Sequence, residues 1–107
     1  MSAIRRIARQ IGERFDPVKI ILFGSYACGQ PHRESDVDLL VVIPAANEIN
    51  QAIRLTPASE PPFSLDLIVR TPENLRRALE EEDWFLSEVV SKGKVLYEKT
   101  DGAMGAP

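Results

Sequence analysis

Apolar residues near the N-terminus recur at helical spacing, and further along the chain they gather in short continuous runs. The helical repeat predicts an amphipathic first helix with a basic outer face, which ends at Asp16-Pro17 because a residue before proline avoids the helical region. The continuous runs 18–23 and 37–43 are each typical of a buried strand. The residues on the apolar face of the first helix are Ile4, Ile7, Ala8, Ile11 and Phe15.

The second half of the chain alternates between helical and strand patterns. Ile49 and Ile53 indicate a short helix, and the prolines that follow predict a loop. The run 63–69 predicts a third strand, with Asp66 in its middle. Thr71-Pro72 then begins a helix, because threonine suits the N-cap and proline suits the first helical position.

A further helix and a last strand complete the pattern. The helix is expected to end at Gly93, and a short strand over 95–97 follows. Together the elements predict about four strands with helices between them. One domain is expected over residues 1–99, and the small, polar residues 100–107 are expected to be disordered. The residues expected to face inward from this last helix are Phe85, Leu86, Val89 and Val90.

Composition narrows the functional classes. The chain has 107 residues, enough for one small domain, and its net charge is −3 with a pI of about 5.1. Proteins that bind nucleic-acid backbones usually carry a basic excess, so nucleic acid is disfavoured as the main partner. Cys28 is the only cysteine, which excludes an internal disulfide and fits a reducing cytoplasm. No apolar run approaches the ~20 residues that span a bilayer, so we expect a cytoplasmic protein.

Two carboxylates stand at the start of the second predicted strand. Asp36 and Asp38 are two residues apart, so a strand directs both to the same side, about 7 Å from each other. At an effective dielectric constant of about 20, two such charges repel by roughly 2 kcal/mol. A fold does not need this arrangement, and we expect a positive group between the two side chains.

A glycine–serine pair precedes the two aspartates by ten residues. Gly24 lets a backbone approach a phosphate closely, and Ser25 supplies a hydroxyl donor; if Ser25 opens a short helical turn, free amides there also face the anion. Asp36 and Asp38 are hard oxygen ligands that suit Mg²⁺. Asp66, on a neighbouring strand, could hold a second metal ion or accept a proton from an attacking hydroxyl. In-line phosphoryl displacement uses such parts.

This pattern resembles the nucleotidyltransferase superfamily related to DNA polymerase beta, and most closely its minimal, single-domain members (MNT-type antitoxins). The family's core motif is an apolar residue, Gly-Ser, about ten residues, then Asp-x-Asp, with a third aspartate on a later strand. The matching residues here are Phe23, Gly24, Ser25, Asp36, Asp38 and Asp66. The resemblance covers most of the chain and implies a small nucleotidyltransferase fold of the α+β class, in which a mixed sheet of about four strands is backed by helices. It also implies that the three aspartates are catalytic and bind metal, and that Gly24 and Ser25 bind the nucleotide.

An activity and a partner follow from the same resemblance. The family transfers a nucleoside monophosphate from a triphosphate, here AMP from ATP, with one or two Mg²⁺ ions. Many minimal members are paired with a HEPN-domain toxin and act as antitoxins, some by transferring AMP to a tyrosine of that toxin. We therefore expect a heteromer with a HEPN-type toxin. Two rivals stay open: a transferase acting on a small molecule such as an aminoglycoside, and an antitoxin that neutralises its toxin by contact alone.

One position departs from the family pattern. Minimal members commonly read Gly-Ser-x-Ala-Arg-Gly, whereas this chain has Cys28 at the place of the arginine. The change removes a phosphate or partner contact and favours the contact-only rival, unless His32 or Arg33 in the same loop supplies the charge. Cys28 itself is expected to be a small packed residue.

Several candidates also have a purely structural explanation. Asp36 and Asp38 could simply be solvated at the start of a strand. Asp66 could lie on the solvent side of an edge strand, although an unpaired carboxylate buried in its apolar run would be costly. The arginines of the first helix form either a solvated face or a docking surface for an acidic partner. Trp84 is expected in the core or in an interface rather than beneath a nucleobase.

Overall fold

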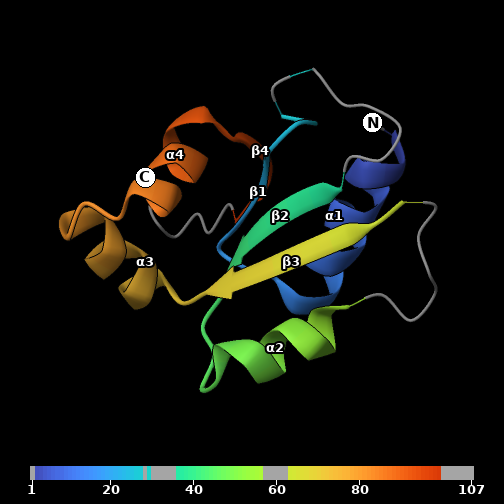
Figure 1. Ribbon diagram of the computed structural model, residues 1–107. Helices are drawn as coiled ribbons and strands as arrows, with labels where there is room; N and C mark the ends of the chain where they lie inside the picture. Colours follow the sequence, from blue (N-terminus) through green and yellow to red (C-terminus); the bar gives the residue numbers. More distant parts are fainter. Residues whose placement is uncertain (1, 28, 30–35, 57–62, 100–107) are drawn as a thin grey trace.

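The protein folds around one mixed sheet of four strands (Figure 1). The computed structural model describes residues 2–27, 29, 36–56 and 63–99. The order across the sheet is β3-β2-β1-β4, in which β1 pairs antiparallel with both β2 and β4, and β2 pairs parallel with β3. This confirms the predicted α+β fold with about four strands. The strands are β1 (Lys19–Phe23), β2 (Val37–Val42), β3 (Leu65–Arg70) and β4 (Lys94–Glu98).

Helices cover both faces of the sheet, and each face has its own apolar cluster (Figure 1). One face packs against α1 through Ile7 and Ile11 and against α2 through Leu55. The other face packs against α4 through Leu86 and Val89, with α3 beside it. The helices are α1 (Ser2–Phe15), α2 (Glu48–Leu55), α3 (Pro72–Glu80) and α4 (Trp84–Lys92). No helix in the described part of the chain is both long and apolar enough to cross a membrane.

Strand β2 explains why its sequence is a continuous apolar run. It lies between β1 and β3, and both of its faces are covered by helices. Residues of a strand alternate between faces, so Leu39 and Val41 enter the α1 cluster whereas Leu40 and Val42 enter the α4 cluster. Every residue of β2 except Asp38 is buried. A polar residue in such a strand therefore indicates a site rather than a surface.

The predicted elements all exist, and their ends lie within two residues of the predicted ones. The face that α2 turns inward nevertheless differs from the one that its apolar pattern suggested. In α2, Leu55 is buried whereas Ile49 and Ile53 are 74% and 67% exposed. A helix of eight residues can press only one narrow stripe against the sheet, and here that stripe contains Leu55.

The inward face of α4 is also narrower than expected. Leu86 and Val89, three residues apart, are buried against the sheet, which places Phe85 and Val90 at the edge of the contact, each 40% exposed. Trp84, the first residue of the helix, is 75% exposed. Of the two places expected for Trp84, the core is therefore excluded, because the helix begins beyond the edge of the apolar cluster, and the interface stays a prediction. The predicted tail over 100–107 lies outside the described residues.

A contact between the first helix and the last strand closes the α1 side of the domain. The ring of Tyr97 on β4 lies against Gly12 of α1, where any Cβ would overlap it. The Tyr97 hydroxyl donates a hydrogen bond to Oδ1 of Asp16 at 3.0 Å, and Lys99 Nζ lies 3.2 Å from the other oxygen of Asp16. Asp16, with φ of 51°, follows the last turn of α1. The glycine therefore makes room for an aromatic ring in a helix that would otherwise favour alanine.

Gly12→Ala should destabilise the protein although alanine is the better helix former. The helical gain is about 1 kcal/mol, but the new methyl group must displace the Tyr97 ring, and overpacking of this kind costs typically about 1–3 kcal/mol. Urea unfolding followed by circular dichroism measures the difference. Gln10→Ala, on the exposed side of the same helix, is the control and should change stability by less than about 0.5 kcal/mol. A Gly12→Ala variant more stable than the wild type would contradict the contact.

Candidate active site

The glycine–serine pair forms a tight turn at the end of β1. Gly24 follows the last residue of the strand and has φ of 80°, a left-handed conformation that favours glycine. The amide of Ala27 donates a hydrogen bond to the carbonyl of Gly24 at 3.1 Å, which closes a single turn. Over residues 25–27 this is a turn and not a helix. We expected a short helical turn here, and the described residues form a single turn that is not helical. Cys28, His32 and Arg33 lie outside the described residues.

The pairing of the strands brings Asp38 and Asp66 together. They are direct partners in the parallel register of β2 and β3, and partners in a sheet direct their side chains to the same face. Phe23, the residue before the turn, is the partner of Asp38 on the other side of β2. Asp36 lies just before β2, two residues from Asp38. The sheet therefore places the glycine turn and the three aspartates at one end of three neighbouring strands.

Gly24 and Asp38 are in close contact. A Cβ placed on Gly24 would overlap Oδ2 of Asp38, so only glycine at this position lets the backbone of the turn lie against the carboxylate. Ser25, the next residue, is half-buried. An anionic group bound by this turn would consequently lie beside the Asp38 carboxylate. Two negative groups held so close need a cation between them.

The electrostatics of Asp38 support a cluster of carboxylates. Partial burial raises the pKa of Asp38 above its usual value, and the charges of Asp66 and Asp36 and a hydrogen bond shared with Asp66 raise this pKa further. Asp36 and Asp66 thus both act on Asp38, as like charges near a shared site do. Asp36 and Asp66 are exposed, and Asp38 is half-buried.

Asp66 does not lie in the buried environment from which its functional role was argued. We expected a carboxylate inside an apolar strand to be costly to bury, yet Asp66 is exposed. Its strand β3 is at the edge of the sheet, so this side chain reaches solvent without penalty. It is the register with Asp38, and not burial, that connects Asp66 to the candidate site.

The donor set suits a divalent cation that is shared with a substrate. Among the described residues, no three histidine, cysteine, aspartate or glutamate side chains already converge closely enough to hold a metal ion. Mg²⁺ is commonly bound by only one or two carboxylates, with phosphate oxygens and water completing its shell. Asp38 with Asp36 or Asp66 offers such a pair of hard oxygen ligands beside the turn. The residues present therefore fit Mg²⁺ together with a bound phosphate.

Trp84 and Phe85 are the neighbours of the site that the sequence did not point to. Together with Phe23 and Gly24 they line a cavity of about 220 Å³. Their spacing in the sequence indicated a helix and its core, and no spacing rule connects residues 84–85 with residue 24. The one available signal was a tryptophan at the first position of a helix. That position need not be buried, so a large aromatic side chain there is open to a ligand or a partner.

Asp38→Asn should stabilise the metal-free protein at neutral pH. The folded state holds the Asp38 proton more tightly than the unfolded chain does, so Asp38 favours folding below its ordinary pKa near 3.8 and loses that contribution as pH rises through its raised folded pKa. Removing the charge should add up to about 1 kcal/mol at pH 7, allowing for solvent screening, and little at pH 3. Urea unfolding with a chelator at both pH values measures this. A gain that is the same at both values would contradict carboxylate repulsion.

Comparison with known proteins agrees with this geometry. The family model for the nucleotidyltransferase domain matches residues 4–99. Among curated proteins, none matches the sequence of this chain. One similar solved structure is a candidate nucleotidyltransferase from Sulfolobus solfataricus, with a TM-score of 0.53 and 22% identity over 71% of this chain and 70% of that one. At this identity the likeness shows the fold alone.

A second similar structure is a toxin–antitoxin crystallised with AMP-PNP. Its TM-score is 0.56 and its identity 27%, over 94% of this chain and 77% of the matched chain. The family match covers nearly the whole described domain and includes the glycine turn and all three aspartates. The chain therefore belongs to the nucleotidyltransferase domain family and is a nucleotidyltransferase.

Proposed function

We propose that this protein transfers AMP from ATP to a hydroxyl group of a toxin partner, and that it thereby acts as the antitoxin of a toxin–antitoxin pair. The observation that carries the proposal is the direct pairing of Asp38 with Asp66 beside the turn at Gly24. Carboxylates that can bind metal ions and a glycine turn that can approach a phosphate, both at one end of a sheet, are the parts that phosphoryl transfer requires.

Each residue of the site has a defined task in this proposal. Gly24 and Ser25 hold the triphosphate through backbone amides and the serine hydroxyl. Asp36 and Asp38, with Asp66 as a further ligand, would hold one or two Mg²⁺ ions, which when bound neutralise the charge between carboxylates and phosphate. Asp66, exposed at the edge of the sheet, is open to an acceptor that arrives from solution.

The bond changes are those of an in-line displacement. The acceptor hydroxyl oxygen forms a bond to the α-phosphorus of ATP, and the bond from that phosphorus to the bridging oxygen breaks. Pyrophosphate leaves with the electron pair of the broken bond. The proton of the hydroxyl passes to a carboxylate oxygen of Asp66, which is the role of a general base.

The toxin as acceptor rests on the structural neighbour. That protein is a toxin–antitoxin with AMP-PNP, a nucleotide that resembles ATP. The resemblance of the motif to minimal nucleotidyltransferases extends the proposal to a HEPN-type toxin and to a tyrosine as the modified residue. Binding to such a partner in the cytoplasm, in a stable heteromer, belongs to the same proposal.

A second candidate is an antitoxin that neutralises by contact alone. It is favoured by Cys28, which stands where related sequences commonly carry an arginine. In that case the nucleotide site is idle and the partner is bound but never modified. The two candidates differ in one measurable property, the mass of the toxin after incubation with ATP and Mg²⁺.

Asp66→Asn should abolish most transfer without preventing partner binding. The amide keeps the shape of the side chain but cannot accept a proton usefully, and a positioned general base contributes typically 10²–10⁴-fold. We expect transfer to slow by about that factor, and by more if Asp66 also binds metal. A mass-spectrometric time course of the co-expressed toxin, with a pull-down beside it, measures both properties.

The control for this variant is Glu13→Gln, which removes an exposed carboxylate from α1. It should modify the toxin at the wild-type rate. Unchanged transfer by Asp66→Asn would take Asp66 out of the mechanism. If the wild type leaves the toxin unmodified and still neutralises it, the contact-only antitoxin is correct.

Mg²⁺ together with AMP-PNP should raise the melting temperature more than AMP-PNP alone does. A ligand at 100 times its Kd stabilises the folded state by about 2.7 kcal/mol, and each kcal/mol shifts the melting temperature of a domain of this size by about 4–8 °C. The extra shift should vanish in an Asp36→Asn, Asp38→Asn double variant. Sodium chloride at matched ionic strength controls for general screening. An equal shift in the double variant would show that these carboxylates do not hold the metal.

A further inference from the structure

An apolar cavity opens beside the glycine turn. Its volume is about 220 Å³, and its walls include Phe23, Gly24, Trp84 and Phe85. The rings of Phe23 and Phe85 meet edge to face, with centroids 5.6 Å apart and planes at 80°. This contact joins the end of β1 to the first turn of α4. Trp84 lies next to it and is largely exposed, so its indole is available to a ligand.

The position of the cavity relates it to the proposed triphosphate site. Gly24 belongs to both, since it lines the cavity and also lies against the Asp38 carboxylate. Phe23, one residue earlier, is the strand partner of Asp38. A ligand whose phosphates are held at the turn can therefore extend from Gly24 onto the aromatic side chains of α4.

The size and chemistry of the cavity suit one flat ring system. Pockets for whole drug-sized ligands have volumes of about 300–1,000 Å³, so this cavity is too small for a complete nucleotide. Aromatic side chains bind nucleobases by stacking, and every base offers such a face. The cavity thus matches the base of ATP, for which the glycine turn and the aspartates offer no contact.

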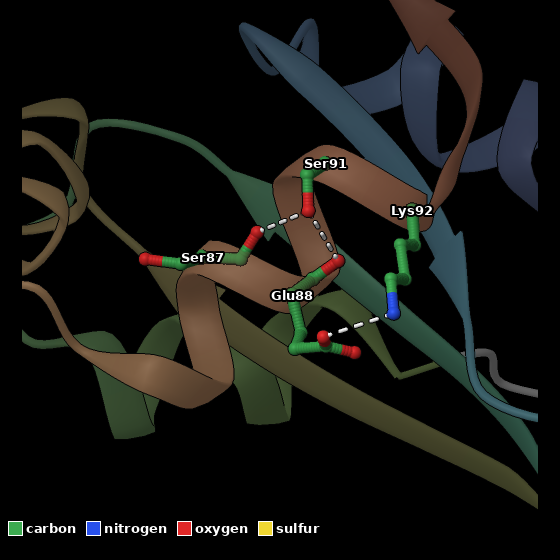
Figure 2. Close-up of polar contacts among 4 residues, drawn as sticks. All are labelled: Ser87, Glu88, Ser91 and Lys92. Atoms are coloured by element: carbon green, nitrogen blue, oxygen red, sulfur yellow. Dashed lines mark hydrogen bonds and ion pairs between the residues drawn. The ribbon is translucent and has the colours of Figure 1, made fainter.

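Two charged side chains of α4 add polar groups to the cavity. Glu88 and Lys92 both line it and form an ion pair of 3.2 Å on the exposed side of the helix (Figure 2). Ser91, which Figure 2 shows beside them, donates its hydroxyl to the carbonyl of Ser87 at 2.8 Å instead of to a side chain. The Glu88 carboxylate can accept from a base amino group, and the Lys92 ammonium can donate to a ring nitrogen.

A larger hollow elsewhere on the sheet is not adjacent to the glycine turn. It measures about 680 Å³ and lies between α2, β3 and α3, with Glu48, Arg70 and Arg77 among its walls. Neither the glycine turn nor any of the three aspartates lines it. A base placed there would not be connected to phosphates held at Gly24.

We propose that the cavity between the glycine turn and α4 binds the nucleobase of the substrate, stacked on the indole of Trp84. The contact with Phe23 holds the Phe85 ring in the wall of the cavity, and Glu88 and Lys92 bind the polar edge of the base. This assignment rests on the proposed function, which places the triphosphate at Gly24 and Ser25. Against the sequence-based expectation, Trp84 is then a binding residue for the base.

The single tryptophan of the chain makes the test direct. With Mg²⁺ present, AMP-PNP should quench the fluorescence of Trp84, because a stacked base contacts the indole. Inorganic tripolyphosphate, which has no base, should compete with AMP-PNP and leave the fluorescence unchanged. Quenching of equal size by both ligands would overturn the proposal.

Substitution of Trp84 measures the contribution of stacking. Loss of one base–aromatic stack weakens binding by about 5- to 150-fold, so Trp84→Ala should bind AMP-PNP that much more weakly in calorimetry. Its affinity for tripolyphosphate should be unchanged, and Trp84→Phe should recover most of the affinity for AMP-PNP. Ile49→Ala, which removes an equally exposed apolar side chain from α2, is the matched control and should bind as the wild type does.

The outcomes separate this inference from the proposed function. If AMP-PNP binds Trp84→Ala as tightly as the wild type, the base site is wrong while the nucleotide site stands. If neither AMP-PNP nor tripolyphosphate binds the wild type, both are wrong. If Trp84→Ala loses the toxin partner but retains AMP-PNP, the surface is a protein interface and the base site is wrong. The melting temperature of Trp84→Ala should match that of the wild type, because Trp84 is largely exposed and the Asp83 side chain still caps α4.

Discussion

The parallel pairing of β2 with β3 is the constraint on which the rest of the structure depends. At one end the amide of Val37 donates a hydrogen bond to the carbonyl of Ser64, and at the other the amide of Ile43 donates to the carbonyl of Arg70. The register does not break between these two bonds. A slip of one residue would turn Asp38 from the α4 side of the sheet into the apolar α1 cluster, where an unpaired carboxylate is costly, and this cost helps to hold the register. The same register makes Asp38 and Asp66 direct partners.

The candidate active site therefore lies in the best-covered part of the sheet, although its carboxylates reduce the stability of the folded protein. Asp38 is the one residue of β2 that is not buried, and its neighbours raise its pKa instead of neutralising it. In the metal-free protein the carboxylates repel one another, and this repulsion is tolerable because Asp66 lies at an edge strand and reaches water. A site that is unfavourable when empty of cations is well prepared to bind a cation together with an anion.

Two glycines show how close approaches organise the molecule. Gly24 lets the turn after β1 lie against the Asp38 carboxylate, and Gly12 lets the Tyr97 ring lie against α1. The first approach serves the site, and the second holds the first helix to the last strand of the sheet. On the other face, Phe23 and Phe85 connect the site to α4. The candidate site is thus held by contacts of the end of β1 with β2 and with α4, which are distant from it in the sequence.

The sequence by itself determined the helices and strands, because apolar periodicity is a local pattern, and the Gly-Ser and Asp-x-Asp spacings were enough to single out three aspartates proposed for catalysis and two residues proposed for nucleotide binding. It could not determine how the short helices rotate, so it placed Phe85 and Val90 further inward than they lie and left Trp84 between the core and an interface. Nor could it place Asp66, whose exposure follows from β3 being at the edge. Strand order makes Asp38 and Asp66 partners, and helix packing places Gly24 beside the aromatic side chains of α4. Only the tertiary structure decided these two contacts, because no spacing along the chain encodes strand order or helix packing.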